Sequence, residues 1–223
     1  MKSYEHLKDK LVEIKLAGNT IKGKLYDVGT DFIVIYTNME FFYLLDEHIQ
    51  EVRICQWNEE EQINTPPQSP FFDNTKVIST KEIFMNARGK MLQVMVFGGI
   101  GIHGYILHIF DDYIHFQSIV LGDLYIPTKH IKGLVIASSS SPSTPLPEMK
   151  KLPKLKSAEA EHVKFIDRLS KSTGKVAIFN QGAPVFNVGK IVQMDENVVH
   201  ITNLNGTTVY ISTDHIKTIH VLD

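Results

Sequence analysis

The sequence predicts a mainly β protein with short helices, built as three tandem small SH3-like or Sm-like barrels, each preceded by a short helix. Two observations support this prediction. A tyrosine followed five residues later by His-Ile occurs near the end of three segments of the chain. Two stretches that together hold seven of the nine prolines separate these segments. Proline cannot donate a hydrogen bond to a sheet and disfavours helix before it, so such stretches are typical of extended linkers.

The repeats and the linkers divide the chain into five parts. Internal repetition of this kind indicates that one fold is used more than once. The predicted parts are repeat 1 at 1–57, a Pro-rich acidic linker at 58–75, repeat 2 at 76–136, a Ser/Pro/Lys linker at 137–156 and repeat 3 at 157–223.

Five positions recur in every repeat, and we call them the marker residues. A glycine is followed eight residues later by Asp or Asn, and a histidine comes 25, 26 and 26 residues after the glycine in the three repeats. A tyrosine precedes each histidine by five residues and an isoleucine follows it directly. The marker residues are Gly23, Asp31, Tyr43, His48 and Ile49; Gly104, Asp112, Tyr125, His130 and Ile131; and Gly189, Asn197, Tyr210, His215 and Ile216.

Short alternating runs such as "VEIKL" and "FIVIY" predict about five strands in each repeat. The apolar residues of "TKEIFMNARGKM" and "AEAEHVKFIDRLSK" instead recur at helical spacing. The marker glycine falls in the second strand, where a missing side chain lets the strand bend or approach a neighbour. The Asp or Asn is expected in the turn into the third strand, and the tyrosine in the fourth.

The residues between tyrosine and histidine predict a tight corner, after which His-Ile begins the fifth strand and the isoleucine points into the core. The histidine allows two interpretations. It could present a metal-binding or ligand-binding imidazole once per repeat, or it could cover the corner and bond a backbone carbonyl. We favour the second interpretation, because no repeated Cys, His or Glu accompanies the histidine at metal-ligand spacing.

The sequence predicts no enzyme, metal site or cofactor. "GGIGIHG" lacks the Lys-Ser/Thr of a phosphate loop and reads as a hairpin turn. Asp111 and Asp112 are adjacent and are expected to be solvated in a turn. His103, His108 and His115 form a loose group, but the first two are five residues apart and so lie on opposite faces of a regular strand. No catalytic constellation results.

Charge and composition weigh against further classes of protein. The chain has 23 basic and 25 acidic residues, so its field would attract nucleic acid only weakly. No apolar run is long enough for a membrane helix, and we expect no membrane insertion. The N-terminal "MKSYEHLKDK" lacks the apolar core of a signal peptide, which favours synthesis in the cytosol. The single cysteine, Cys55, cannot form an internal disulfide and is expected to be a buried, inert thiol.

Several phrases resemble the spore coat protein B (CotB) family of endospore-forming bacilli. The clearest is "FNQGAPVFNVGKIV" at 179–192, which is similar to the Asn/Arg-x-Gly-Gly-Pro phrase of that family and its following strand. The ending "HIKTI" at 215–219 resembles the family's "HIKSI". The likeness covers all three repeats and is clearest in the third, since "LAGNTIKGKL" and "FGGIGIHGYI" in the first two lack the Gly-Pro phrase.

This resemblance implies a non-enzymatic structural protein of the outer spore coat, made in the mother-cell cytoplasm and assembled on the forespore. Its expected partners are other spore coat proteins, with self-association as a further contact and no nucleic acid. Linked modules agree with this function, because weak contacts through several surfaces add up by effective concentration. Family members often carry a long phosphorylated tail rich in serine and lysine. We expect no such tail here, and the serine cluster of this sequence is "SSSS" at 138–141.

The alternative function is an Sm-like RNA-binding protein, since Sm-like barrels assemble into rings that bind single-stranded RNA. The near-neutral charge weighs against it, as does the lack of an aromatic and basic cluster repeated in all three units.

Overall fold

The computed structural model describes residues 4–56, 63, 71, 78–137, 164–183, 186–195 and 197–222. These residues are mainly β-strand, as predicted. The chain divides into two compact units. Unit 1 comprises Met1–Ile102 and Ile131–Met149, and unit 2 comprises His103–His130 and Lys150–Asp223.

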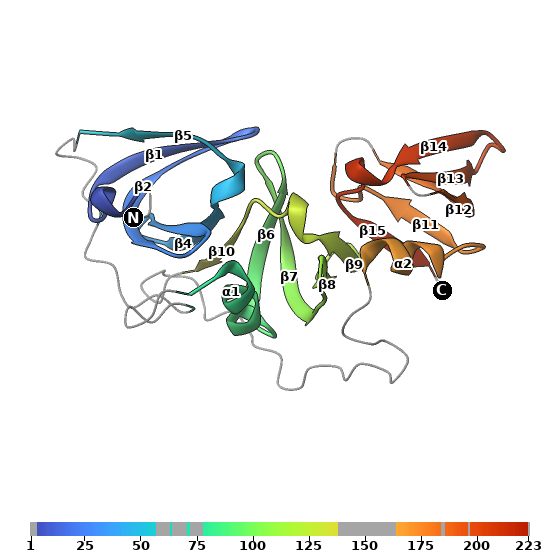
Figure 1. Ribbon diagram of the computed structural model, residues 1–223, viewed down its shortest axis with the longest axis horizontal. Coiled ribbons are helices and arrows are strands. Elements are labelled where there is room, and N and C mark those ends of the chain that lie inside the picture. Colours follow the sequence, from blue (N-terminus) through green and yellow to red (C-terminus); the bar gives the residue numbers. More distant parts are fainter. Residues whose placement is uncertain are drawn as a thin grey trace. The chain divides into compact units, whose positions relative to one another are not determined.

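The described elements form three sets of five strands in the same order, one set for each predicted repeat (Figure 1). Set 1 contains η1 (Glu5–Leu7), β1 (Leu11–Leu16), β2 (Asn19–Val28), β3 (Phe32–Tyr36), β4 (Glu40–Leu45), η2 (Asp46–His48) and β5 (Ile49–Ile54). Set 2 contains α1 (Thr80–Ala87), β6 (Met91–Phe97), β7 (Ile100–Ile109), β8 (Tyr113–Ser118), β9 (Gly122–Pro127), η3 (Thr128–His130) and β10 (Gly133–Ala137). Set 3 contains α2 (Phe165–Ser170), β11 (Val176–Phe179), β12 (Asn187–Met194), β13 (Val198–Asn203), β14 (Thr208–Ser212), η4 (Thr213–His215) and β15 (Ile219–Leu222).

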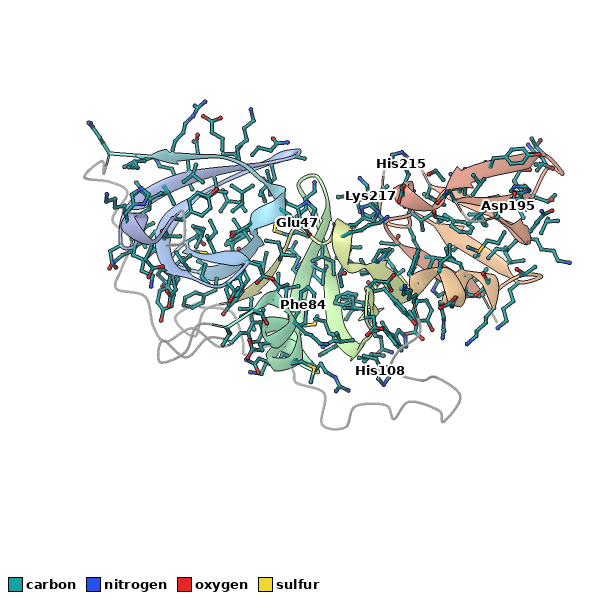
Figure 2. The ribbon with its side chains drawn as sticks, viewed as in Figure 1. Glu47, Phe84, His108, Asp195, His215 and Lys217 are labelled. Atoms are coloured by element: carbon teal, nitrogen blue, oxygen red, sulfur yellow. The ribbon has the colours of Figure 1, made fainter. Side chains whose placement is uncertain are left out.

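The helical segments confirm the sequence pattern only in part. Ser79 caps α1 in a capping box with Glu82, and Phe84 of the same helix is buried (Figure 2). In set 3 the helix begins at Phe165, and residues 158–163 of the predicted helix lie outside the described residues. Set 1 has a single 3-10 turn, Glu5–Leu7, where a helix was expected.

The second strand of every set carries the same irregularity. Its antiparallel pairing with the third strand shifts register two residues after the marker glycine. Such a bulge bends a strand and increases its twist. The shifts lie between Leu25 and Asp27, between Ile106 and His108, and between Ile191 and Gln193.

The marker glycines are required because the third strand passes close to them. A Cβ at Gly104 would lie 2.0 Å from the carbonyl oxygen of Gln117. At Gly23 and Gly189 it would lie 2.7 Å from the oxygen of Tyr36 and 2.6 Å from the oxygen of Thr202. A backbone oxygen is an obstacle in each case, joined at Gly23 by Cγ2 of Ile35 at 2.6 Å, so a side chain can enter only if the two strands separate.

The corner before the fifth strand is the same in all three sets. The histidine ends a short 3-10 turn, and the first residue of that turn donates its N–H to the carbonyl oxygen of the marker Asp or Asn. The three donors and acceptors are Asp46 and Asp31 at 3.0 Å, Thr128 and Asp112 at 2.9 Å, and Thr213 and Asn197 at 2.9 Å. This bond ties the turn before the third strand to the end of the fourth.

Two expectations for the corner need correction. His-Ile leads directly into the fifth strand in set 1, but β10 and β15 begin two and three residues after their isoleucines. In set 3 the reason is that Lys217 N donates to the side-chain oxygen of Asn180, at 2.7 Å, in place of a strand partner. Ile131 and Ile216 are fully buried as predicted, whereas Ile49 is only partly buried.

Separate tandem barrels are not what the strand pairing shows. The antiparallel order is β5-β1-β2-β3-β4-β10-β6 in unit 1 and β7-β8-β9-β15-β11-β12-β13-β14 in unit 2, with β7 starting at the end of unit 1. The fifth strands β10 and β15 pair with the first strand of their own set and also with the fourth strand of the preceding set. The sets are therefore joined by shared hydrogen-bonded edges. One buried apolar cluster in unit 1 and another in unit 2 lie against these strands.

We expect Gly104→Ala to lower the free energy of unfolding by about 1–3 kcal/mol or more, the usual cost of forcing atoms into a packed site. Denaturant unfolding would measure the change. Lys190→Ala, on the exposed face of the bent strand β12, is the control and should cost little. Equal stability of the wild type and Gly104→Ala would show that the strands are not held at this separation.

Candidate functional site

The fourth strand of one set pairs with the fifth strand of the next at two places. We call β4–β10 the first junction and β9–β15 the second junction. The first junction extends from Leu44↔Gly133 to Glu40↔Ala137 and includes Tyr43 opposite Leu134. The second is shorter and has Tyr125 opposite Ile219. Leu134 and Ile219 both lie four residues after the marker histidine, so the two junctions have the same register.

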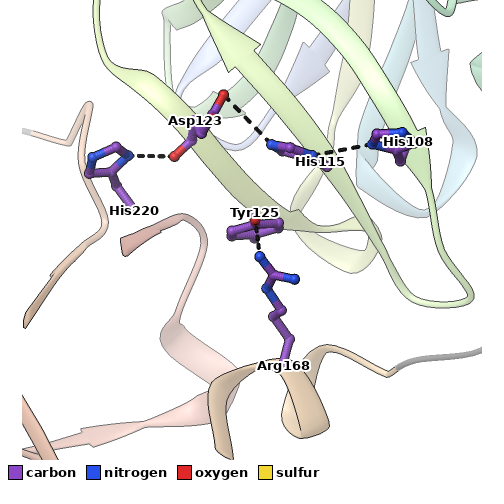
Figure 3. A network of polar contacts seen from close by, with 6 residues as sticks. All are labelled: His108, His115, Asp123, Tyr125, Arg168 and His220. Atoms are coloured by element: carbon purple, nitrogen blue, oxygen red, sulfur yellow. Dashed lines mark hydrogen bonds and ion pairs between the residues drawn. The ribbon is translucent and has the colours of Figure 1, made fainter. Parts of the chain in front are cut away.

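The marker tyrosine is buried at both junctions. Tyr43 is 0% and Tyr125 8% exposed. The Tyr43 ring lies 5.2 Å from that of Phe71, whose backbone N–H donates to the tyrosine hydroxyl at 3.3 Å. Arg168 of α2 stacks its guanidinium 3.9 Å from the centre of the Tyr125 ring and donates to the Tyr125 hydroxyl (Figure 3). In both cases, the residue that covers the tyrosine lies between the two junction strands in the chain.

The marker aspartates connect neighbouring sets through a second contact. Asp31 accepts the backbone N–H of Thr80, the first residue of α1, and Asp112 accepts that of Phe165, the first residue of α2; both distances are 2.8 Å. Each carboxylate satisfies an N–H at a helix N-terminus that has no partner within the helix. Both aspartates lie in the turn where they are predicted, but the sequence gives no signal of this contact, because the helix lies far along the chain.

The two junctions differ in length for a reason visible in the sequence. Leu45 donates its backbone N–H to the carbonyl oxygen of Lys132 at 3.0 Å and so extends the first junction. The equivalent residue of the second junction is Pro127, which has no N–H to donate. Next to it, an exposed ion pair joins the two corners: Lys129 Nζ lies 2.6 Å from Asp214 Oδ1 and lowers the pKa of this carboxyl.

Histidines gather beside the second junction, although not as a metal site (Figure 3). The Nδ1 atoms of His108 and His115 are 3.3 Å apart, and the His115 ring stacks on Tyr125 at 4.8 Å. His220 of β15 contacts the carbonyl oxygen of Asp123 through Nδ1. His103 takes no part in this network. Within the described part of the chain, no three His, Cys, Asp or Glu side chains are grouped so that they could hold a metal ion.

His48 occupies the corner of set 1 near the next set. Burial lowers its pKa, and the nearby positive charge of Lys132 adds to the effect, while Glu47 opposes it. Lys132 also donates from Nζ to the carbonyl oxygen of Ala17. The neutral imidazole is therefore the favoured form at this corner.

The marker tyrosine of set 3 lacks the cover seen in the other two sets. Tyr210 lies on β14 and is 66% exposed, with His200 against its ring at 4.6 Å. Asn197, like Asp31 and Asp112, is exposed in the turn before the third strand of its set. Among the described residues, no strand pairs with the outer edge of β14, and none pairs with the outer edge of β5.

Other predicted features are placed as follows. Cys55 is a free thiol directly after β5 and is partly, not fully, buried. The serines at 138–141 lie outside the described residues. None of the helices among the described residues is both long and apolar enough to cross a membrane.

Comparison with known proteins finds a similar chain in Bacillus. A family model described as "YwrJ third domain" matches residues 164–219, which lie within the predicted third repeat. The uncharacterized protein YwrJ of Bacillus subtilis (strain 168) is 27% identical over 214 residues, covering 94% of this chain and 95% of that protein. The likeness therefore spans nearly the full length of both proteins.

We expect Asp112→Ala to destabilise unit 2 by about 0.5–2 kcal/mol, the usual cost of losing a helix N-terminal cap. The matched control is Asn197→Ala at the equivalent position of set 3, whose side chain has no following helix among the described residues to bind. Thermal unfolding of the two variants would measure the difference. An equal effect of both substitutions would contradict the role of Asp112 as a cap.

We expect acid to destabilise the wild type more than His48→Gln. The pKa of His48 is lower folded than unfolded, so below its ordinary value of 6.5 the unfolded chain binds a proton that the folded chain resists. Stability should be full above that value and fall as the pH drops through it. Urea unfolding at about pH 7.5 and about pH 5.5 would compare the two proteins. An unchanged pH dependence in the variant would contradict this assignment.

Proposed function

We propose that this protein is a non-enzymatic structural component of the bacterial outer spore coat, and that it assembles through several protein–protein contacts. We further propose that each set of five strands is a variant of a small SH3-like or Sm-like barrel. The repeated bulge two residues beyond the marker glycine supports this, as does the pairing of the first and fifth strands in every set.

The observation that carries the proposal is the use of strand edges and buried tyrosines to join one set to the next. A chain that repeats its scaffold positions and joins its repeats edge to edge is suited to forming a layer, because strand edges are natural sites of pairing between proteins. The residues that recur in all three sets serve packing: the glycines allow close approach, and the Asp or Asn anchors the corner.

Sequence similarity to other proteins supports the proposed location in the spore coat. The phrases at 179–192 and 215–219 resemble the spore coat protein B family, and the described parts of both lie in set 3. The similar YwrJ protein comes from Bacillus subtilis, and the resembled family occurs in endospore-forming bacilli. The proposed partners are other spore coat proteins, and the proposed place of synthesis is the mother-cell cytoplasm.

A fluorescent fusion followed through sporulation in the source organism would test this function. We expect a shell around the forespore that persists on released spores, while free fluorescent protein from the same promoter stays diffuse in the mother cell. Diffuse signal in vegetative cells with none on the spore would contradict the proposal. Co-purification of RNA with the fusion would then decide for the Sm-like RNA-binding alternative.

A further inference from the structure

We propose that β14 of one copy of this chain pairs with β5 of a second copy, in the register of the two internal junctions. This pairing would be one of the protein–protein contacts in the proposed function, and it rests on the proposed function in this respect alone. At both internal junctions a fourth strand meets a fifth strand. The remaining fourth strand is β14 and the remaining fifth strand is β5, and both are the last strands in the order of their units.

The register of the internal junctions fixes which residues meet. Tyr43 lies opposite Leu134 and Tyr125 opposite Ile219, in both cases the residue four positions after the histidine. The same rule places Tyr210 opposite Val52 of the second copy. Leu134 and Ile219 are fully buried, whereas Val52 is only partly covered by its own unit. Val52 would therefore place an aliphatic side chain opposite Tyr210, as Leu134 and Ile219 do opposite Tyr43 and Tyr125.

Burial shows that the edges of β14 and β5 are incomplete. The marker tyrosine is 0% exposed at the first junction and 8% at the second, but Tyr210 is 66% exposed. On the other strand, Ile54 is 61% exposed. Large apolar side chains on an open strand edge favour pairing with another edge, and soluble proteins usually protect such edges with charge or proline. Pairing of β14 with β5 would place both side chains within a single interface.

The side chains of β5 indicate that the contact between copies would resemble the second junction more closely than the first. The first junction needs Gly133, since a Cβ there would lie 2.5 Å from the oxygen of Tyr43. Its equivalent in β15 is Thr218 and in β5 is Glu51, both of which carry a Cβ. Arg53 of β5 takes the place of His220, which contacts a backbone oxygen of β9. Arginine also supplies N–H donors for that contact.

The backbone of β14 is better suited to pairing than that of β9. Ser212 occupies the position of Leu45 and Pro127, and like Leu45 it has an N–H to donate. Leu45 uses this group to bond Lys132 O in the next set. The rule for the register makes Gln50 O the acceptor for Ser212 in the second copy.

One charge contact weakens the proposed pairing and offers a test of it. The residues before the marker histidines meet at the second junction, where Lys129 and Asp214 form an ion pair at 2.6 Å. In the contact between copies, Asp214 would meet Glu47, which lies in the corner between β4 and β5 (Figure 2). Two carboxylates repel each other. Association of the wild type is therefore expected to be reversible, and reversal of the charge at Glu47 should strengthen it.

Sedimentation of the purified full-length protein over a range of concentrations tests the pairing. We expect self-association by the wild type, weakened about tenfold or more by Tyr210→Ser, because buried aromatic anchors dominate such interfaces. Leu204→Ser, which removes an apolar side chain that is 90% exposed on the same set, should leave it unchanged. A wild type that stays monomeric at every concentration, or equal association by both variants, would overturn the proposal.

A charge variant is expected to strengthen association, so its effect cannot be explained by loss of a surface side chain. We expect Glu47→Lys to associate more strongly than the wild type, and this gain should shrink at high salt. Glu5→Lys changes the net charge equally but lies on η1, outside β4, β5 and the corner between them, and should have no such effect. Equal association of the two lysine variants would contradict the placement of Glu47 opposite Asp214.

Disulfide trapping tests the register between two copies. In a Cys55→Ser background, Ile54→Cys protein mixed with Thr208→Cys protein should form the mixed disulfide, because the two positions face each other under the proposed register. The control mixture pairs Ile54→Cys with Ser212→Cys, four residues further along β14, and should cross-link far less. Equal cross-linking in both mixtures would overturn the register. These results are independent of spore localisation, so the function and the pairing can fail separately.

Discussion

The structure depends on one interaction, the antiparallel pairing of a fourth strand with the fifth strand of the next set. Backbone hydrogen bonds alone would allow several registers, and the buried tyrosine opposite an aliphatic residue selects one of them. Tyr43 with Leu134 and Tyr125 with Ile219 are the two examples. The corner hydrogen bond and the helix cap made by the marker aspartate then fix the turns on either side of that pairing.

This interaction links the fold to the proposed function. Sets 1 and 3 each have an apolar cluster made largely of their own residues, and pairing with a neighbouring set adds buried apolar surface as well as hydrogen bonds. Val135 of β10 belongs to the apolar cluster that also includes Ile33 and Leu44 of set 1. Because pairing of strand edges stabilises the sets, a strand edge without a neighbour remains available to pair with another strand. An assembly protein can use such an edge without further machinery.

Differences between the two junctions come from single residues with clear physical effects. Pro127 removes one N–H donor and shortens the second junction. Two side-chain contacts stabilise this junction instead, the Lys129–Asp214 ion pair and the stacking of Arg168 on Tyr125. Gly133 admits the close approach that makes the first junction long. Single residues therefore set the length of each junction, although both junctions pair a fourth strand with the fifth strand of the next set.

The sequence by itself determined the repeat, the strands and the marker positions, because alternation of apolar residues, turn residues and the need for glycine act over a few neighbours. Gly104, Asp112 and Tyr125 lie in the strand and turn positions that it predicts. The tertiary structure alone decided that β4 binds β10 and that Asp112 caps α2, since these partners are far apart in the chain. A strand edge offers the same backbone groups to its own set and to the next, and only the packing of tyrosine and aliphatic side chains decides between them.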